Sequence, residues 1–84
     1  MKIEKIFFIV KFVVKINYLL VSKNSSKLTQ ALVTIRNDRF VIPVKNDFKN
    51  SIKGLIHDTS SSGETVYIEP LIILEMNNKL KIKK

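Results

Sequence analysis

The stretch Ala31-Leu-Val-Thr-Ile-Arg-Asn-Asp-Arg-Phe-Val-Ile-Pro-Val-Lys45 decides the fold, because apolar and polar residues alternate on both sides of a short polar segment. The alternating apolar positions of strands expected over 32–36 and 40–45 are Val33 and Ile35, then Phe40, Ile42 and Val44. The segment Asn37-Asp38-Arg39 between them is a turn signal, so the stretch predicts a β-hairpin. Pro43 cannot donate a hydrogen bond to a neighbouring strand, so we expect it at an edge or an irregularity.

A second stretch, Gly54-Leu-Ile-His-Asp-Thr-Ser-Ser-Ser-Gly-Glu-Thr-Val-Tyr-Ile-Glu-Pro70, has the same form. It predicts strands over 54–58 and 65–69, joined by a turn at 60–63. Pro70 suits the first position of a helix, which we expect from about 70 to 84. Ile73, Met76, Asn77 and Leu80 lie at helical spacing, and the polar pair Asn77-Asn78 leaves that helix only a narrow apolar stripe. It has no capping residue at its end, as expected of a chain cut from a longer one.

The first 24 residues are apolar and basic, and they predict an N-terminal helix. The run from Ile6 to Val21 is mostly apolar, but Lys11 and Lys15 interrupt it. A membrane-spanning helix needs about 20 apolar residues and tolerates a central lysine poorly, and a signal peptide would need an unbroken apolar region. Lys11 and Lys15 share one stripe of a helix, so we favour an amphipathic helix that packs on another element. A membrane-surface helix over residues 3–21 is the alternative.

These elements place the chain in the α+β class: an N-terminal helix, a small antiparallel β-meander of about four strands, and a C-terminal helix. Residues 1–24 form one part and residues 25–84 the other. A chain of 84 residues without cysteine has neither a large core nor disulfides, so its stability alone should be marginal. We expect an exposed apolar face that other parts of a larger protein would cover, and that would favour association of the chain alone.

The net charge of +8 invites a nucleic-acid interpretation, but the charge lies at the two ends of the sequence. Residues 1–24 and residues 79–84 each carry a net charge of +4, and residues 25–78 are neutral. Arg36 and Arg39, which flank the expected turn, are the weak candidates for nucleic-acid contacts. We prefer a structural role for them, with the turn held by hydrogen bonds from Asp38 and the arginines paired to acids elsewhere.

No motif for chemistry is found in the sequence. Neither Gly54 nor Gly63 precedes a lysine, so there is no phosphate-binding loop, and a single histidine with dispersed carboxylates cannot form a metal site. His57 and Asp58 precede three serines, yet neighbours on a strand point to opposite faces and should not pair. We therefore expect no catalytic, cofactor-binding or metal-binding residue. The aromatic rings of Phe40 and Tyr67 could stack on bases, but on alternating strands they are more often core residues.

Beyond these patterns, the two quoted stretches resemble blocks of the bacterial MutS-two family, the MutS paralogues that lack a mismatch-reading domain. Glu75-Met-Asn-Asn-Lys-Leu80 resembles the helix that follows in that family. The resemblance covers about residues 25–80. Residues 14–24 resemble the end of the preceding family helix only vaguely, and residues 1–13 have no counterpart. Lys53-Gly54 stands where the family usually has two glycines.

The resemblance implies a cytoplasmic, non-catalytic piece of the core and lever region, between the core helices and a long coiled helix. Members of this family are dimeric ATPases that use ATP and Mg²⁺, often with a coiled-coil clamp and a C-terminal nuclease domain. They are linked to DNA repair, to restraint of recombination and to rescue of collided ribosomes. The partners implied are therefore the remaining domains of a MutS-like protein and, through them, DNA or the ribosome. No functional residue of the family maps onto this chain. The alternatives are a small basic nucleic-acid-binding protein and a membrane-associated protein.

Overall fold

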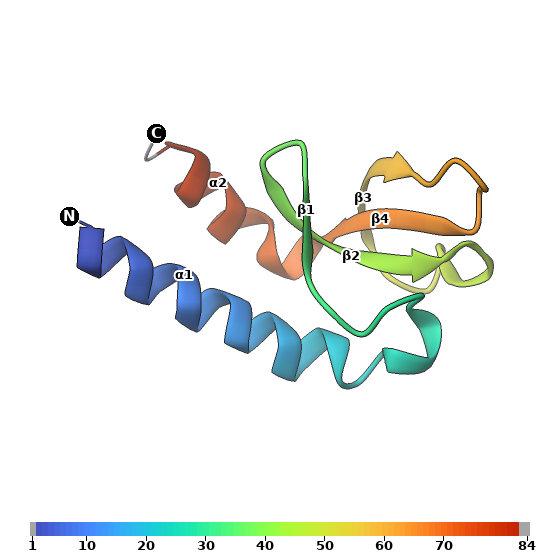
Figure 1. The fold of residues 1–84 in the computed structure, drawn as a ribbon, viewed down its shortest axis with the longest axis horizontal. Coiled ribbons are helices and arrows are strands. Elements are labelled where there is room, and N and C mark those ends of the chain that lie inside the picture. The colour runs from blue at the N-terminus through green and yellow to red at the C-terminus, as the bar shows by residue number, and fades with distance from the viewer. Residues whose placement is uncertain (1, 83–84) are drawn as a thin grey trace.

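The computed structural model describes residues 2–82 and arranges them as a helix, a four-stranded sheet and a second helix (Figure 1). Helix α1 (Lys2–Ile16) continues into a π-helical stretch (Asn17–Val21), and helix α2 (Leu74–Ile82) follows a 3-10 turn (Leu71–Ile73). The strands are β1 (Thr34–Arg36), β2 (Arg39–Lys45), β3 (Gly54–Thr59) and β4 (Thr65–Pro70). The predicted α+β class is thereby confirmed, while the predicted helix end at 83–84 lies outside the described residues.

The sheet is antiparallel throughout, with the strand order β1-β2-β4-β3. Strands β1 and β2 form one hairpin and β3 and β4 form the other, and the hairpins meet through β2 and β4. The order departs from a strict meander at one point, because β4 rather than β3 pairs with β2. This order makes β4 a central strand, with a neighbouring strand on each side.

The first hairpin has a two-residue turn, which corrects its expected boundaries. Arg36 pairs with Arg39, so Arg39 belongs to β2 and only Asn37 and Asp38 form the turn. Both turn residues have positive φ, 55° and 64°, the geometry of a type I′ turn that asparagine and aspartate tolerate. Asp38 thus contributes by adopting this conformation; within residues 2–82, no hydrogen bond of its side chain is found. The first strand is also shorter than expected, since its pairing ends at Thr34.

Pro43 lies where β2 has lost its β1 neighbour, which confirms the expectation of an edge-like position. Its carbonyl accepts a hydrogen bond of 3.0 Å from the amide of Thr29, on the side away from β4. In a strand the amide nitrogen and carbonyl of one residue point the same way, so the nitrogen of Pro43 also points away from β4. The β2–β4 ladder therefore needs no donor from Pro43.

Strand β3 approaches β4 closely at its first residue, Gly54. A Cβ atom built on Gly54 would lie 2.2 Å from the carbonyl oxygen of Glu69, too close for any side chain. Gly54 pairs with Pro70, which corrects the expected place of Pro70: it ends β4 and does not begin the helix. The amide of Leu71 then donates to the carbonyl of Lys53 at 3.0 Å, which fixes the exit from the strand to the start of β3.

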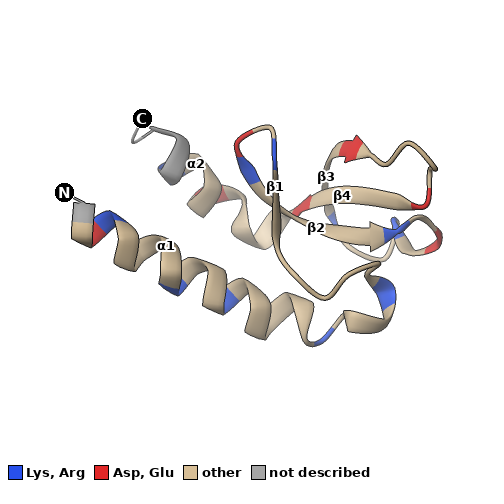
Figure 2. Cartoon of the chain, in the orientation of Figure 1, with Lys and Arg blue, Asp and Glu red and all other residues tan. Residues whose placement is uncertain are grey.

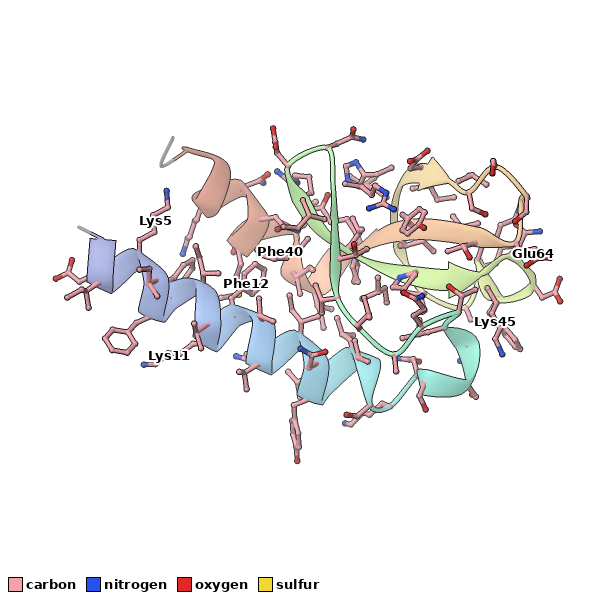
Figure 3. All side chains as sticks on the ribbon, viewed as in Figure 1. Lys5, Lys11, Phe12, Phe40, Lys45 and Glu64 are labelled. Carbon is pink, nitrogen blue, oxygen red and sulfur yellow. The ribbon has the colours of Figure 1, made fainter. Side chains whose placement is uncertain are left out.

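The apolar core lies between α1, the sheet and the turn that precedes α2. Its buried members are Phe12, Ile16, Val21, Leu28, Ile42, Val44, Val66, Ile68 and Ile73. The ring of Phe12 meets the ring of Phe40 edge to face, with the centroids 5.3 Å apart (Figure 3). The N-terminal helix therefore packs on the sheet, as its favoured interpretation required. Among residues 2–82, no helix has the length and apolar character needed to cross a membrane.

A buried polar network as the candidate functional site

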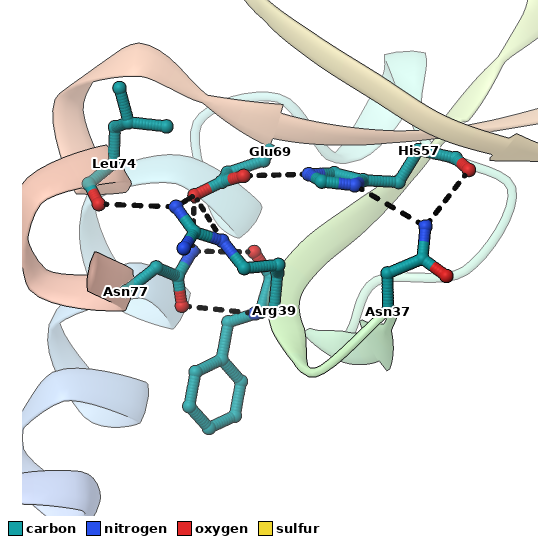
Figure 4. A network of polar contacts seen from close by, with 7 residues as sticks. Asn37, Arg39, His57, Glu69, Leu74 and Asn77 are labelled. Carbon is teal, nitrogen blue, oxygen red and sulfur yellow. Dashed lines mark hydrogen bonds and ion pairs between the residues drawn. The ribbon is translucent and has the colours of Figure 1, made fainter. Parts of the chain in front are cut away.

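Polar side chains from separate elements of the fold meet around the carboxylate of Glu69 (Figure 4). They come from the first turn, from each strand after it and from α2: Asn37, Arg39, His57, Glu69 and Asn77. Glu69 is completely buried, and Asn77 is 2% exposed. Burial of an ionised group is costly unless hydrogen bonds satisfy it, so the network must be nearly complete to exist. Among the described residues, no buried polar side-chain atom lacks a partner.

Arg39 supplies the charge that balances Glu69. Its Nε donates to Oε2 of Glu69 at 3.0 Å, and its Nη2 contacts the same oxygen. Nη2 also donates to the carbonyl of Leu74, 3.4 Å away at the start of α2. Because Arg39 is only 9% exposed, removal of either partner would leave an uncompensated buried charge.

Asn77 fixes α2 to the backbone of β2. Its Oδ1 accepts from the amide of Phe40 at 3.0 Å, and its Nδ2 donates to the carbonyl of Phe40 at 3.1 Å. Continuation of the β2–β4 register, in which Ile42 pairs with Ile68, would put Phe40 opposite Pro70. Pro70 has no amide hydrogen and ends its strand, so the amide side chain of Asn77 provides the donor and acceptor that β4 does not. Nδ2 also donates to Oε2 of Glu69 at 2.9 Å.

His57 joins the network from β3, at a residue where that strand is irregular. Ile56 pairs with Ile68 and Asp58 with Tyr67, so His57 is the extra residue of a β-bulge. Its Nε2 lies 2.6 Å from Oε1 of Glu69. Nδ2 of Asn37 lies 3.4 Å from Nδ1 of the histidine and donates to its carbonyl at 3.3 Å. Both ring nitrogens of His57 therefore have a polar partner within the network.

The environment of Glu69 keeps it ionised. Burial acts to raise the pKa of its carboxyl group, but hydrogen bonds from Arg39, His57 and Asn77, with the positive charge of Arg39, outweigh burial and leave the pKa below its usual value. The carboxylate accepts on both oxygens and has no free side towards solvent. Its geometry therefore suits the joining of elements rather than proton transfer to a substrate.

The two arginines singled out as nucleic-acid candidates are both engaged within the chain. Arg39 belongs to the buried network, whereas Arg36 lies at the surface with its guanidinium 4.1 Å from the centre of the Tyr67 ring. Nε of Arg36 is 3.7 Å from Oδ2 of Asp58, and its Nη1 donates to the carbonyl of Ile35 at 2.8 Å. Pairing of the arginines with acids elsewhere is thus observed, and Asp58 turns to Arg36 rather than to His57.

The surface charge follows no single element. Figure 2 shows lysines and arginines on α1, on the β1–β2 hairpin and in the loops, with acidic residues between them. Within residues 2–82, no group of three or more His, Asp or Glu side chains is placed to hold a metal ion. The polar side chains that do cluster among these residues are those of the buried network around Glu69.

Sequence reasoning missed Glu69 and Asn77, and it placed His57 in a plain strand. One signal was available: Asn77 interrupts the apolar stripe of its helix at a position that faces the core. A polar residue at a core-facing position needs a partner, and an ionised residue such as Glu69 at the end of an apolar strand needs one as well. Their connection through the backbone of Phe40 depends on the strand order and has no sequence signature.

Fold and network together define a small α+β structural unit, in which the buried ionisable groups join strands to a helix. No family model matches the chain. It is 54% identical over 68 residues to the endonuclease MutS2 of Finegoldia magna, a match of 81% of this chain and 9% of that protein. It is 58% identical over 59 residues to the endonuclease MutS2 of Enterococcus faecalis, which covers 70% of the chain and 8% of the relative.

The chain is therefore a MutS2-like segment, and it spans less than a tenth of the length of the curated relatives it matches. A third relative, the endonuclease MutS2 of Lactococcus lactis, matches over 70 residues at 50% identity, which is 83% of the chain. Any match of that length must include residues 15–70 of this chain, whichever end it starts from. The similarity thus takes in the last part of the N-terminal helical region as well as the whole sheet, and the predicted resemblance is confirmed.

Proposed function

We propose that this chain serves as a non-catalytic structural segment of a MutS-like protein, in the position of its core and lever region. The observation that carries the proposal is the network around Glu69. All the side chains that enter this buried network hold the β1–β2 turn, three strands and α2 in fixed positions. A rigid joint between a helix and a sheet is what a segment that transmits force between larger domains requires.

Exposed apolar side chains on the sheet and before α2 support the same proposal. They lie at the edge strands β1 and β3 and in the turn after β4: Ile35, Leu55, Ile56, Leu71 and Ile72. Surfaces of this kind mark contacts with other protein. Neighbouring parts of a MutS-like protein would cover them.

The activities of such a protein would then lie outside these 84 residues. ATP and Mg²⁺ would bind elsewhere in a dimeric, cytoplasmic protein, as would DNA or the ribosome. Control of recombination, DNA repair and ribosome rescue would belong to that assembly. The similarity to proteins named endonuclease MutS2 supports this context.

Activity assays on the purified chain test the non-catalytic role. We expect neither ATP hydrolysis nor cleavage of plasmid and branched DNA above the background of a mock purification. DNA binding, followed by fluorescence anisotropy, should be weak and should change little when Arg36 is replaced by alanine, with K49A as the matched surface control. Turnover of ATP, DNA cleavage, or tight binding that R36A alone abolishes would contradict the proposal.

A further inference from the structure

Helix α1 has two apolar sides, and only one of them is used within the chain. Phe12 and Ile16 are buried in the core that α1 shares with the sheet, and Figure 3 shows Phe12 directed towards Phe40 while Lys11 points away from the sheet. The apolar residues of the outer side are Ile3, Phe7, Val10 and Val14, which are 52–69% exposed. A helix that is apolar around most of its circumference is normally covered on all sides.

The outer residues have the spacing of a helix–helix seam. Successive members are four, three and four residues apart, which is the a/d pattern of a coiled coil. The pattern places the four side chains in one continuous stripe along α1, against which a second helix can pack lengthwise.

Two charged residues next to the seam, Glu4 and Lys11, can pair between two copies of α1 that run in opposite directions. Glu4 and Lys11 are exposed and lie seven residues apart, so they occupy equivalent positions of the repeat on the same flank of the seam. In an antiparallel pair of α1 helices centred between Phe7 and Val10, Glu4 of each copy lies near Lys11 of the other. In a parallel pair this flank of each copy would lie on opposite sides of the seam, so Glu4 and Lys11 would not meet.

The geometry points to a second copy of this chain as the partner of this face, bound through an antiparallel α1–α1 contact. Phe7 packs beside Val10 of the second copy, and Ile3 beside its Val14. Ile6 and Tyr18, which are 58% and 72% exposed, extend the apolar face at its margins. A standard specific interface is formed by about 20–30 residues per partner, so a contact of six apolar side chains from each helix predicts a weak dimer, with micromolar or weaker affinity. The inference rests on α1 alone and is independent of the proposed role of the segment.

Sedimentation equilibrium of the whole chain, over about 1 µM to 1 mM, tests the dimer and its charge pattern. V10D should leave a monomer with unchanged circular dichroism. E4K or K11E alone should weaken association by about tenfold, and the double swap should restore it, because two symmetric ion pairs are reversed and then rebuilt. E64K and K23E change the net charge equally at exposed sites away from the seam and should have no effect. A monomer at every concentration, or association that V10D leaves intact, would overturn the proposal.

Introduced cysteines test the antiparallel direction, since the chain has none of its own. Under mild oxidation, I3C and V14C should each form little disulfide dimer alone, but a mixture of the two should form the mixed dimer. Efficient dimers of V14C with itself would show a parallel contact and refute the arrangement. Co-sedimentation with vesicles of phosphatidylglycerol and phosphatidylcholine, by a chain that stays monomeric without them, would assign the face to membranes instead.

Discussion

Replacement of Asn77 by alanine should weaken the attachment of α2 to the sheet and lower the free energy of unfolding, while it leaves the apolar core unchanged. The change removes one side-chain amide that is 2% exposed and makes three hydrogen bonds, two with the backbone of Phe40 and one with Glu69. An unsatisfied buried polar group costs about 1–3 kcal/mol, and Phe40 would be left with a donor and an acceptor that have lost their partner. Water that enters the gap would recover part of this, so we expect a loss of about 3 kcal/mol.

The chain itself supplies the matched control for this experiment. Asn78 is the next residue of the same helix, is exposed, and has the same side chain. Both N77A and N78A gain about 0.5 kcal/mol of intrinsic helix propensity, because alanine favours a helix more than asparagine does. The difference between the two variants therefore isolates the contacts of Asn77.

Urea unfolding, followed by far-ultraviolet circular dichroism at one fixed protein concentration, measures that difference. With a slope of about 1–1.5 kcal/mol/M for a small domain, N77A should unfold at a urea concentration about 2–3 M lower than N78A, with an unchanged slope. N78A should match the parent chain or exceed it slightly. Two variants with midpoints within about 0.3 M of each other would refute the reasoning, since the amide would then contribute nothing that water cannot replace.

Three further predictions follow from the same contacts. G54A should lower the free energy of unfolding by more than about 3 kcal/mol, because its Cβ would meet the carbonyl of Glu69 at 2.2 Å. Thermal unfolding measures this change. A loss under about 1 kcal/mol would show that the close approach does not constrain this position. Because the folded pKa of Glu69 is lowered, the stability it contributes is present above the unfolded pKa of about 4.3 and is lost as the pH falls towards the folded pKa. E69Q should therefore be less stable at pH 7 and should show a flatter loss of stability below about pH 4.5, and an acid limb identical to the parent's would exclude this role. R39A should lower the free energy of unfolding by about 3–5 kcal/mol, since it leaves Glu69 buried without its counter-charge. R36A should lower it by at most about 1 kcal/mol, since the ion pair of Arg36 is exposed. Equal losses in denaturant titrations would contradict this difference.

Local sequence pattern was sufficient for the elements whose signals are local. Alternation placed the strands within two residues of their observed bounds, and Asn37 and Asp38 gave the turn because their side chains tolerate positive φ. Pro43 was located correctly because the absence of its amide hydrogen restricts it wherever it stands. The boundary at Pro70 was wrong, because pairing with Gly54 carries the strand one residue further than the proline signal indicates.

The network could not be predicted, because its parts are distant in sequence. Asn77 binds a backbone 37 residues away, and Arg39 binds a carboxylate 30 residues away. Both contacts exist only because β4 enters the sheet next to β2, an order that no local pattern specifies. The bulge at His57 is likewise a consequence of β3–β4 pairing, and the imidazole that contacts Glu69 stands in it.

Amide hydrogen exchange of Phe40, read by nuclear magnetic resonance in the intact chain, tests most directly whether the network joins α2 to the sheet. The amide has no strand partner on its β4 side and donates to Oδ1 of Asn77, so it should exchange as slowly as the amides of Ile42 and Val44. In N77A its protection should fall while theirs remains measurable. Exchange of the Phe40 amide at the rate of an open loop in the parent chain would contradict the account.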